Sequence, residues 1–104
     1  MSETAVGNAG GAAITLANGT LAAAFTTLQS NGSLGQGINL NNVSGALTVS
    51  GNTGVANSGD DGIRVQNSAG LTADLGNTTV TNSGSHSVNL SSNAGSTFTF
   101  DTLS

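Results

Sequence analysis

The sequence predicts an all-β fold, a single-stranded parallel β-helix (β-solenoid) of three to four coils with about 25 residues per coil. Three observations predict it. Residues 37–61 resemble residues 62–86 at a fixed step, and a third copy begins at Ser87. Apolar and polar residues alternate within each copy, and Gly and Asn recur at matching places between the alternating segments. Self-similarity of this period is typical of solenoids, in which each unit buries its apolar face against its neighbours.

The predicted organisation is a flexible leader followed by the solenoid. Residues 1–11 are rich in Gly, Ala and Asn, which favours a loose leader. Residues 12–36 form an atypical first coil, because terminal repeats that cap a stack are often irregular. The three remaining coils are expected at 37–61, 62–86 and 87–104.

Apolar residues one period apart are expected to form stacked columns in the core. Ile38-Asn39-Leu40 shows the alternation of a short strand with one buried face. The predicted columns are Ile38 with Ile63 and Val88, Leu40 with Val65 and Leu90, and Val55 with Val80. Leu47 and Val49 are one residue out of phase with the next copy, which predicts a bulge or a shifted loop.

Corners of the coil are expected at the recurring Gly and Asn residues, since both adopt left-handed backbone conformations at low cost. Asn42 and Asn67 lie one period apart, as do Asn57 and Asn82. Stacked side-chain amides at such corners can form hydrogen-bonded ladders, and Ser92 would lie above Asn67. The alternative is that these Asn residues only form exposed turns.

Composition excludes several classes of function. Gly, Asn, Ser and Thr make up more than half of the 104 residues, which a solenoid with a narrow core tolerates. One Arg, no Lys and five acidic residues give a net charge of −4, which excludes a nucleic-acid surface. No stretch approaches the 18 apolar residues of a membrane span, so membrane insertion is not expected. No signal peptide or anchor is evident, and we expect a segment of a longer extracellular or cell-surface protein.

Asp60 and Asp61 are the only adjacent carboxylates, in the predicted corner SGDDG. Such a pair could bind calcium or serve acid/base chemistry on a polysaccharide. The favoured interpretation is an exposed turn, because the chain has too few charged groups to build a carbohydrate-active face.

His86 lies one period above Asp61, which predicts a solvent-exposed ion pair between adjacent coils. Arg64 is expected to point outward beside Asn39 and Asn89. One His and one carboxylate are too few ligands for zinc, so no metal, cofactor or catalytic site is expected.

The blocks GINLNNVSGALTVSG, GIRVQNSAGLTADLGNTTVTNSG and SVNLSSNAGSTFTF resemble repeats of large secreted bacterial surface proteins. The resemblance is to right-handed parallel β-helices of the autotransporter-passenger and filamentous-haemagglutinin-like adhesin type, and it covers about residues 12–100. It implies a right-handed coil within a long rod or secreted fibre.

The leading functional hypothesis is a non-enzymatic structural segment, an adhesin stalk or matrix fibre. One alternative is a filament subunit that stacks head to tail through open coil ends. Another is a glycan-binding or glycan-active β-helix. Expected partners are other copies at the coil ends, and host-surface or matrix glycans or proteins.

Overall fold

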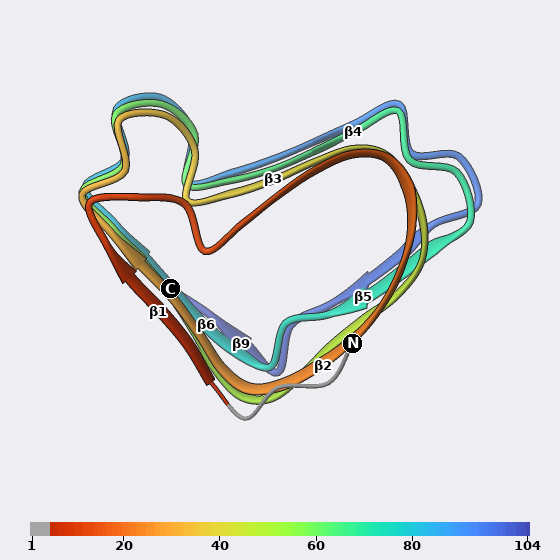
Figure 1. Ribbon diagram of the computed structural model, residues 1–104, viewed down its shortest axis with the longest axis horizontal. Helices are drawn as coiled ribbons and strands as arrows, with labels where there is room; N and C mark the ends of the chain where they lie inside the picture. Colours follow the sequence, from red (N-terminus) through yellow and green to blue (C-terminus); the bar gives the residue numbers. More distant parts are fainter. Residues whose placement is uncertain (1–4) are drawn as a thin grey trace.

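The computed structural model describes residues 5–104, with the backbone alone over residues 5–9 (Figure 1). Over this range the chain forms nine β-strands and no helix. The strands are β1 (Ala5–Ala9), β2 (Ile14–Asn31), β3 (Ile38–Ala56), β4 (Ile63–Gln66), β5 (Leu71–Asp74), β6 (Asn77–Thr81), β7 (Val88–Ser91), β8 (Thr97–Thr99) and β9 (Thr102–Leu103).

Parallel pairing alone joins the described strands, and the chain winds through about four turns, which confirms the predicted β-solenoid. In Figure 1 the chain runs clockwise as it recedes from the viewer, so the coil is right-handed. Its cross-section has three sides, named here after the short strands of the third turn. They are the β4 side (14–17, 38–41, 63–66 and 88–91), the β5 side (21–25, 45–49, 71–74 and 97–99) and the β6 side (5–9, 27–31, 52–56, 77–81 and 102–103).

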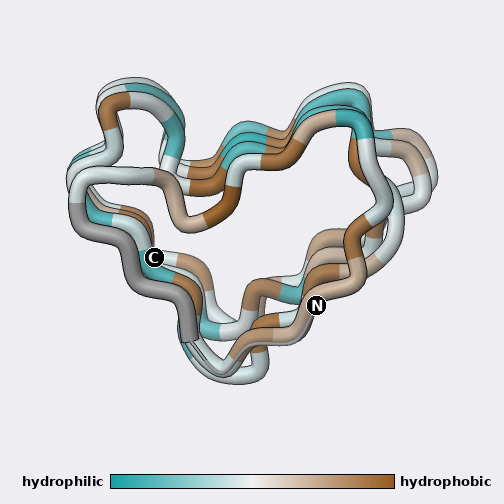
Figure 2. Tube along the Cα trace, viewed as in Figure 1, coloured by the Kyte–Doolittle hydropathy of each residue, from teal (hydrophilic) through white to brown (hydrophobic). Residues whose placement is uncertain are grey.

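The predicted columns lie along the core. Backbone pairing aligns Ile38 with Ile63 and Val88, Leu40 with Val65 and Leu90, and Val55 with Val80. Figure 2 shows apolar residues recurring at corresponding places in successive coils. The middle members are buried, whereas Leu90 in the last coil is 39% exposed because no described coil covers it.

A polar column in the core lies next to the apolar ones. Thr53 and Thr78 are buried in register with Leu28, at the start of the β6 side. Both hydroxyls donate to the Leu75 carbonyl, at 2.8 and 3.1 Å, and so satisfy a backbone acceptor where the coil turns. Sequence alternation did not reveal this column, although the two Thr residues lie one period apart.

Left-handed residues form the corners, as predicted. Asn42, Asn67 and Ser92 have φ of 56°, 53° and 57° at equivalent places, and Asn57 and Asn82 have φ of 56° and 53°. Gly45 is also left-handed, with φ of 100°, and a Cβ there would lie 2.1 Å from the Leu21 carbonyl oxygen. Only glycine fits at that corner.

The strands of the first two turns are longer than predicted. β2 and β3 continue around the corner between the β4 and β5 sides, because their ladder stays in register from Ile14 opposite Ile38 to Phe25 opposite Val49. The expected short strands are found in the last two turns, where loops 67–70 and 92–96 interrupt the ladder.

The predicted phase shift of Leu47 is confirmed. On the β4 side Ile38 pairs with Ile63, but on the β5 side Leu47 pairs with Ala73, one residue further along. The original step returns where Asn52 pairs with Asn77. Compared with coil 37–61, coil 62–86 therefore has one more residue in the corner between the β4 and β5 sides. It has one fewer in the corner between the β5 and β6 sides.

The predicted leader is wrong over residues 5–9, which form β1 and pair in parallel with Thr27–Asn31. This strand takes up backbone hydrogen bonds at the edge of β2, which would otherwise be open there. Residues 1–4 of the predicted leader lie outside the described residues.

The solenoid is slightly wider than it is tall. Its principal extents are 29, 27 and 23 Å, and Figure 1 looks along the shortest of them, down the solenoid axis. Two loops extend outward from the three-sided frame. The larger one, here called the corner loop, joins the β6 and β4 sides at residues 32–37, 57–62 and 82–87.

Candidate functional site

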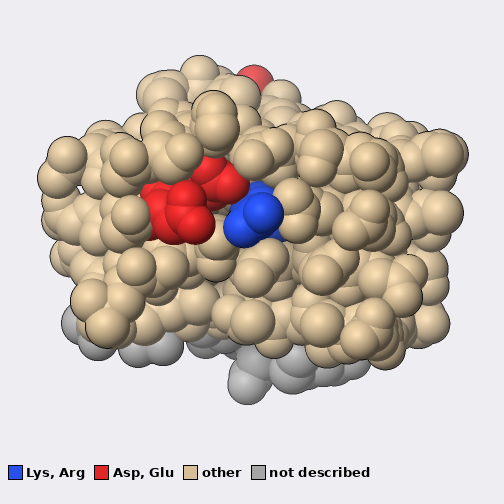
Figure 3. All heavy atoms as spheres, turned by 90° about the horizontal axis from the view of Figure 1, so that it is seen from above, with Lys and Arg blue, Asp and Glu red and all other residues tan. Residues whose placement is uncertain are grey.

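Charged residues gather where the corner loop meets the β4 side. Figure 3 shows acidic side chains beside Arg64, the only Lys or Arg of the chain. Gln36, Asp61 and His86 occupy equivalent places in three successive corner loops, one residue before the Gly or Ser that precedes each strand. The site is therefore built by the repeat itself, from three coils.

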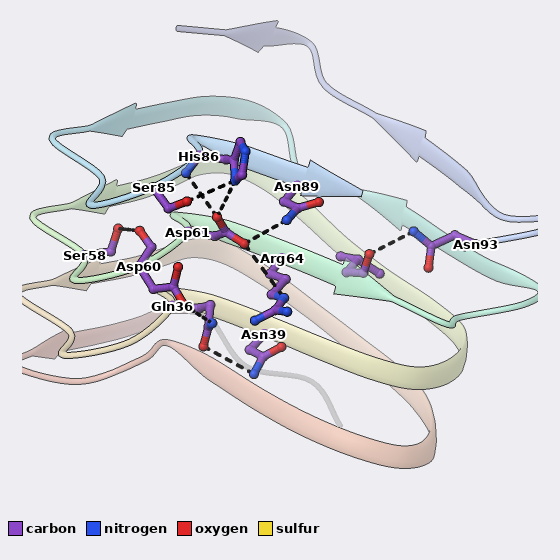
Figure 4. A network of polar contacts seen from close by, with 11 residues as sticks. Gln36, Asn39, Ser58, Asp60, Asp61, Arg64, Ser85, His86, Asn89 and Asn93 are labelled. Carbon is purple, nitrogen blue, oxygen red and sulfur yellow. Dashed lines mark hydrogen bonds and ion pairs between the residues drawn. The ribbon is translucent and has the colours of Figure 1, made fainter. Parts of the chain in front are cut away.

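Asp61 is buried, with 3% of its surface exposed, so the predicted exposed turn is wrong for this residue. Its Oδ1 accepts hydrogen bonds from the His86 backbone N–H at 3.0 Å and from His86 Nδ1 at 2.9 Å. Its Oδ2 accepts one from Asn89 Nδ2 at 3.0 Å (Figure 4). A buried carboxylate is tolerated because these donors replace the water that it loses.

His86 and Asp61 form the inter-coil pair that their spacing predicts, but only the His side of it is in solvent. The His86 side chain is 67% exposed and that of Asp61 only 4%. Nδ1 must carry a proton to donate to a carboxylate, whether the ring is neutral or charged. The ring therefore covers the Asp61 carboxylate on its outer side.

The pKa of Asp61 lies below its ordinary value of 3.8. Burial raises this pKa, but the hydrogen bonds from the His86 backbone, the His86 ring and Asn89, together with the charge of His86, outweigh burial. The carboxylate is thus ionised at neutral pH and acts as a permanent acceptor between two coils.

Arg64 lies beside Asn39 and Asn89 in register, as predicted. Its Nε is 3.8 Å from Asp61 Oδ2, too far for a hydrogen bond, and this buried atom has no hydrogen-bond partner among the described residues. With 32% of the side chain exposed, the pair contributes on the order of 1 kcal/mol or less.

Asp60 makes a second link between coils. Its Oδ2 accepts a hydrogen bond from Gln36 Nε2 at 3.0 Å, and Gln36 Oε1 accepts one from Asn39 Nδ2 at 3.4 Å. The two neighbouring carboxylates therefore point in different directions: Asp60 contacts the preceding coil and Asp61 the following one (Figure 4). No described group of three or more His, Cys, Asp or Glu side chains could hold a metal ion.

Asparagine ladders run along two corners. Asn82 donates to Asn57 at 2.8 Å, as predicted, and Asn57 donates in turn to Asn31 at 3.0 Å. Asn31 was missed because it precedes the left-handed position, which Gly32 occupies in that coil.

The predicted contact between Asn42 and Asn67 is wrong. Asn67 donates to Asn41 at 3.2 Å, whereas Asn42 donates to Asn18 in the coil below at 2.9 Å. The chain path explains this, because β3 continues past Asn42 while the next coil leaves the ladder after Gln66.

Beyond Asn67, the side chains that link the coils are Ser68 and Asn93, in loops 67–70 and 92–96. Ser68 is fully buried, and its Oγ accepts a hydrogen bond from the Val43 N–H at 3.0 Å. Asn93 Oδ1 accepts from the Ser68 N–H at 2.9 Å, and Asn93 Nδ2 donates to the Val65 carbonyl at 2.9 Å. These side chains replace backbone pairing at the corner where the strand ladder is interrupted.

No family model, curated protein or solved structure matches this chain. Within residues 5–104, no helix is long and apolar enough to cross a membrane.

Proposed function

We propose that this chain is a non-enzymatic structural segment of an extracellular or cell-surface β-solenoid, an adhesin stalk or matrix fibre. The observation that carries the proposal is that polar side chains form hydrogen bonds between neighbouring coils. The side chains of Asp61, Asn57 and Ser68 each form at least one hydrogen bond with an adjacent coil. Side chains used in this way hold coils together along the axis, which is what a rod requires.

The outward surface supports the same role. It consists mainly of Asn, Ser and Thr, with a net charge of −4 over the whole sequence. Such a surface is hydrated and does not favour apolar association between the sides of neighbouring rods. Its amides and hydroxyls can hydrogen-bond matrix glycans or neighbouring proteins. The similarity of the repeats to those of secreted bacterial adhesins favours a place outside the cell.

A glycan-active role has less support. A general acid or nucleophile must reach its substrate, and the Asp61 carboxylate is buried with both oxygens already hydrogen-bonded to His86 and Asn89. Asp60 is bonded to Gln36, in the opposite direction along the axis.

Immunolabelling of intact and permeabilised producing cells, with an antibody against this chain, tests the location. We expect equal labelling of both, and labelling that requires permeabilisation would overturn the extracellular role. The second test is incubation with a panel of polysaccharides. We expect no release of reducing ends, and release that the Asp61→Asn variant abolishes would overturn the non-enzymatic role.

A further inference from the structure

We propose that a hollow on the outer face of the β6 side binds one sugar ring of a neutral glycan. The hollow has a volume of about 240 Å³, and it is lined by Gln29, Asn31, Gly54, Ala56 and Thr79. It lies over β3, which has a coil on either side. This inference rests on the structural role proposed above and deepens it, because it names the class of matrix partner and the place where that partner binds.

The hollow exists because two small residues lie outward in the middle of three paired strands. Gly54 and Ala56 of β3 are paired with Gln29 and Asn31 of β2. On the other side, Gly54 is paired with Thr79 of β6. Side chains alternate between the two faces of a strand, so these five residues lie on the same outer face. The two small residues leave a gap between longer neighbours.

The backbone does not require glycine at position 54. Gly54 is not in the left-handed region, and among the described residues a Cβ there would meet no atom closer than Gln29 Cγ at 3.8 Å. Gly45 and Gly59 are different, because a Cβ there would lie 2.1 and 2.3 Å from a carbonyl oxygen. Glycine inside a strand weakens the strand, and it often marks a place where a ligand approaches closely. The fold itself therefore does not need this hollow.

The rim of the hollow carries three polar groups that are available to a ligand. Among the described residues, the Gln29 amide, Asn31 Nδ2 and the Thr79 hydroxyl have no hydrogen-bond partner, and all three side chains are exposed. Asn31 Oδ1 accepts a hydrogen bond from Asn57 Nδ2 at 3.0 Å, so the ladder orients this amide. A group that is oriented in advance binds a ligand at a lower entropic cost.

The chemistry of the hollow favours a neutral sugar. Amides and hydroxyls can donate and accept, as sugar hydroxyl groups do, and Gly54 and Ala56 leave room for the C–H groups of a ring. No charged side chain of the described residues lines the hollow, so it offers no counter-charge to an ionised ligand. Its volume is below the roughly 300–1,000 Å³ of typical small-molecule pockets, which fits a single ring.

A protein segment fits the hollow less well. An extended peptide is commonly bound by adding a strand to an open sheet edge. Here the strand under the hollow is an interior one, because residues 52–56 of β3 pair with both β2 and β6, and these ladders use its backbone groups. A peptide would therefore have side-chain contacts alone, whereas a sugar ring needs only the side-chain groups of the rim.

The test is a titration of the isotope-labelled chain with the methyl glycosides of glucose, galactose and mannose, followed by NMR. We expect at least one glycoside to shift the side-chain amide signals of Gln29 and Asn31 and the backbone signal of Gly54. These shifts should saturate with a Kd on the order of 1 mM. Absence of such shifts up to about 100 mM of every glycoside would overturn the proposal. Tighter binding of glucuronate would overturn the assignment to neutral sugars.

Two variants locate the site. Gly54→Thr fills the hollow and should weaken binding about tenfold or more. Its stability to urea should equal or exceed that of the parent, because Thr favours strands more than Gly does. Gln29→Ala removes one rim amide and should weaken binding about three- to tenfold. The matched control is Ala46→Thr, at an exposed position of β3 on the β5 side, which should leave binding unchanged.

Unchanged binding by Gly54→Thr would show that the sugar binds elsewhere and would overturn the assigned site. Shifts caused by a capped Ala-Thr-Ala peptide, but by none of the glycosides, would favour a protein partner and also overturn it. Neither result changes the outcome of the immunolabelling or of the polysaccharide panel. Labelling that requires permeabilisation, in turn, bears on the extracellular role and not on the titration, so the two proposals fail separately.

Discussion

His86 Nδ1 lies 2.9 Å from Asp61 Oδ1, although the two residues are 25 positions apart in the chain. The repeat step places them in adjacent coils, and the same Asp61 oxygen also accepts the His86 backbone N–H. Asp61 therefore satisfies a backbone donor in the corner loop, where the strand ladder is interrupted. Asp61 satisfies a backbone N–H at a corner of the solenoid, as a capping side chain does at the N-terminus of a helix.

Replacing Asp61 by Asn should destabilise the fold by about 1–3 kcal/mol, because the amide NH₂ group would face a donor from either His86 or Asn89. Urea unfolding followed by circular dichroism at neutral pH measures the change. Asp60→Asn is the matched control, since Asp60 is less buried and an amide oxygen can still accept from Gln36. The control should stay within about 0.5 kcal/mol, and equal losses in both variants would contradict this account of Asp61.

Acid should remove the contribution of Asp61. Because its pKa is lower in the folded than in the unfolded chain, the carboxylate stabilises the fold above pH 3.8. That stability is lost as pH falls from 3.8 through the lower folded pKa. Unfolding free energies of the parent and the Asp61→Asn variant should therefore converge as the pH is lowered below 3.8. A constant difference between them at all pH values would refute the assignment.

Gly59→Ala should destabilise the fold by about 1–3 kcal/mol, the usual cost of overpacking. A Cβ at Gly59 would lie 2.3 Å from the Leu34 carbonyl oxygen, and the corner loops would have to separate. The matched control is Gly35→Ala in the first corner loop, where a Cβ meets no atom within 4 Å. Thermal unfolding should show a clear loss for the first variant and little change for the second, and the reverse order would show that the loops are not stacked as described.

The core columns should respond to truncation according to burial. Ile63 is fully buried between two other aliphatic residues, so Ile63→Ala should cost about 2–5 kcal/mol. Leu34 is 94% exposed, and Leu34→Ala should change the unfolding free energy by no more than about 0.5 kcal/mol. Chemical denaturation of both variants at low protein concentration provides the comparison. Similar costs would mean that the column register is wrong.

Asn57 combines a left-handed backbone with a place in the ladder, and two substitutions separate these roles. Asn57→Gly keeps the backbone conformation and removes the amide contacts with Asn31 and Asn82, which are exposed and weak. Asn57→Ala removes the contacts and also strains the backbone, for a further cost of about 1–2 kcal/mol. Unfolding free energies should therefore rank parent, Gly variant and Ala variant in falling order. An Ala variant as stable as the Gly variant would contradict the left-handed corner.

The sequence by itself determined the solenoid, the step between coils and the columns of Ile63 and Val65, because stacked identical units must align residues one period apart. It also located the corners, since few residues other than Gly and Asn adopt positive φ readily.

Tertiary structure decided which polar groups are buried. Asp61 is buried because His86 and Asn89 of the next coil provide its hydrogen-bond donors. The inward position of Ser68 and the contact of Asn67 with Asn41 depend on the lengths of loops in neighbouring coils. These lengths differ by single residues between the coils, as the pairing of Leu47 with Ala73 shows. A period predicts which residues are in register, but the donors that a side chain reaches depend on where each loop leaves the ladder.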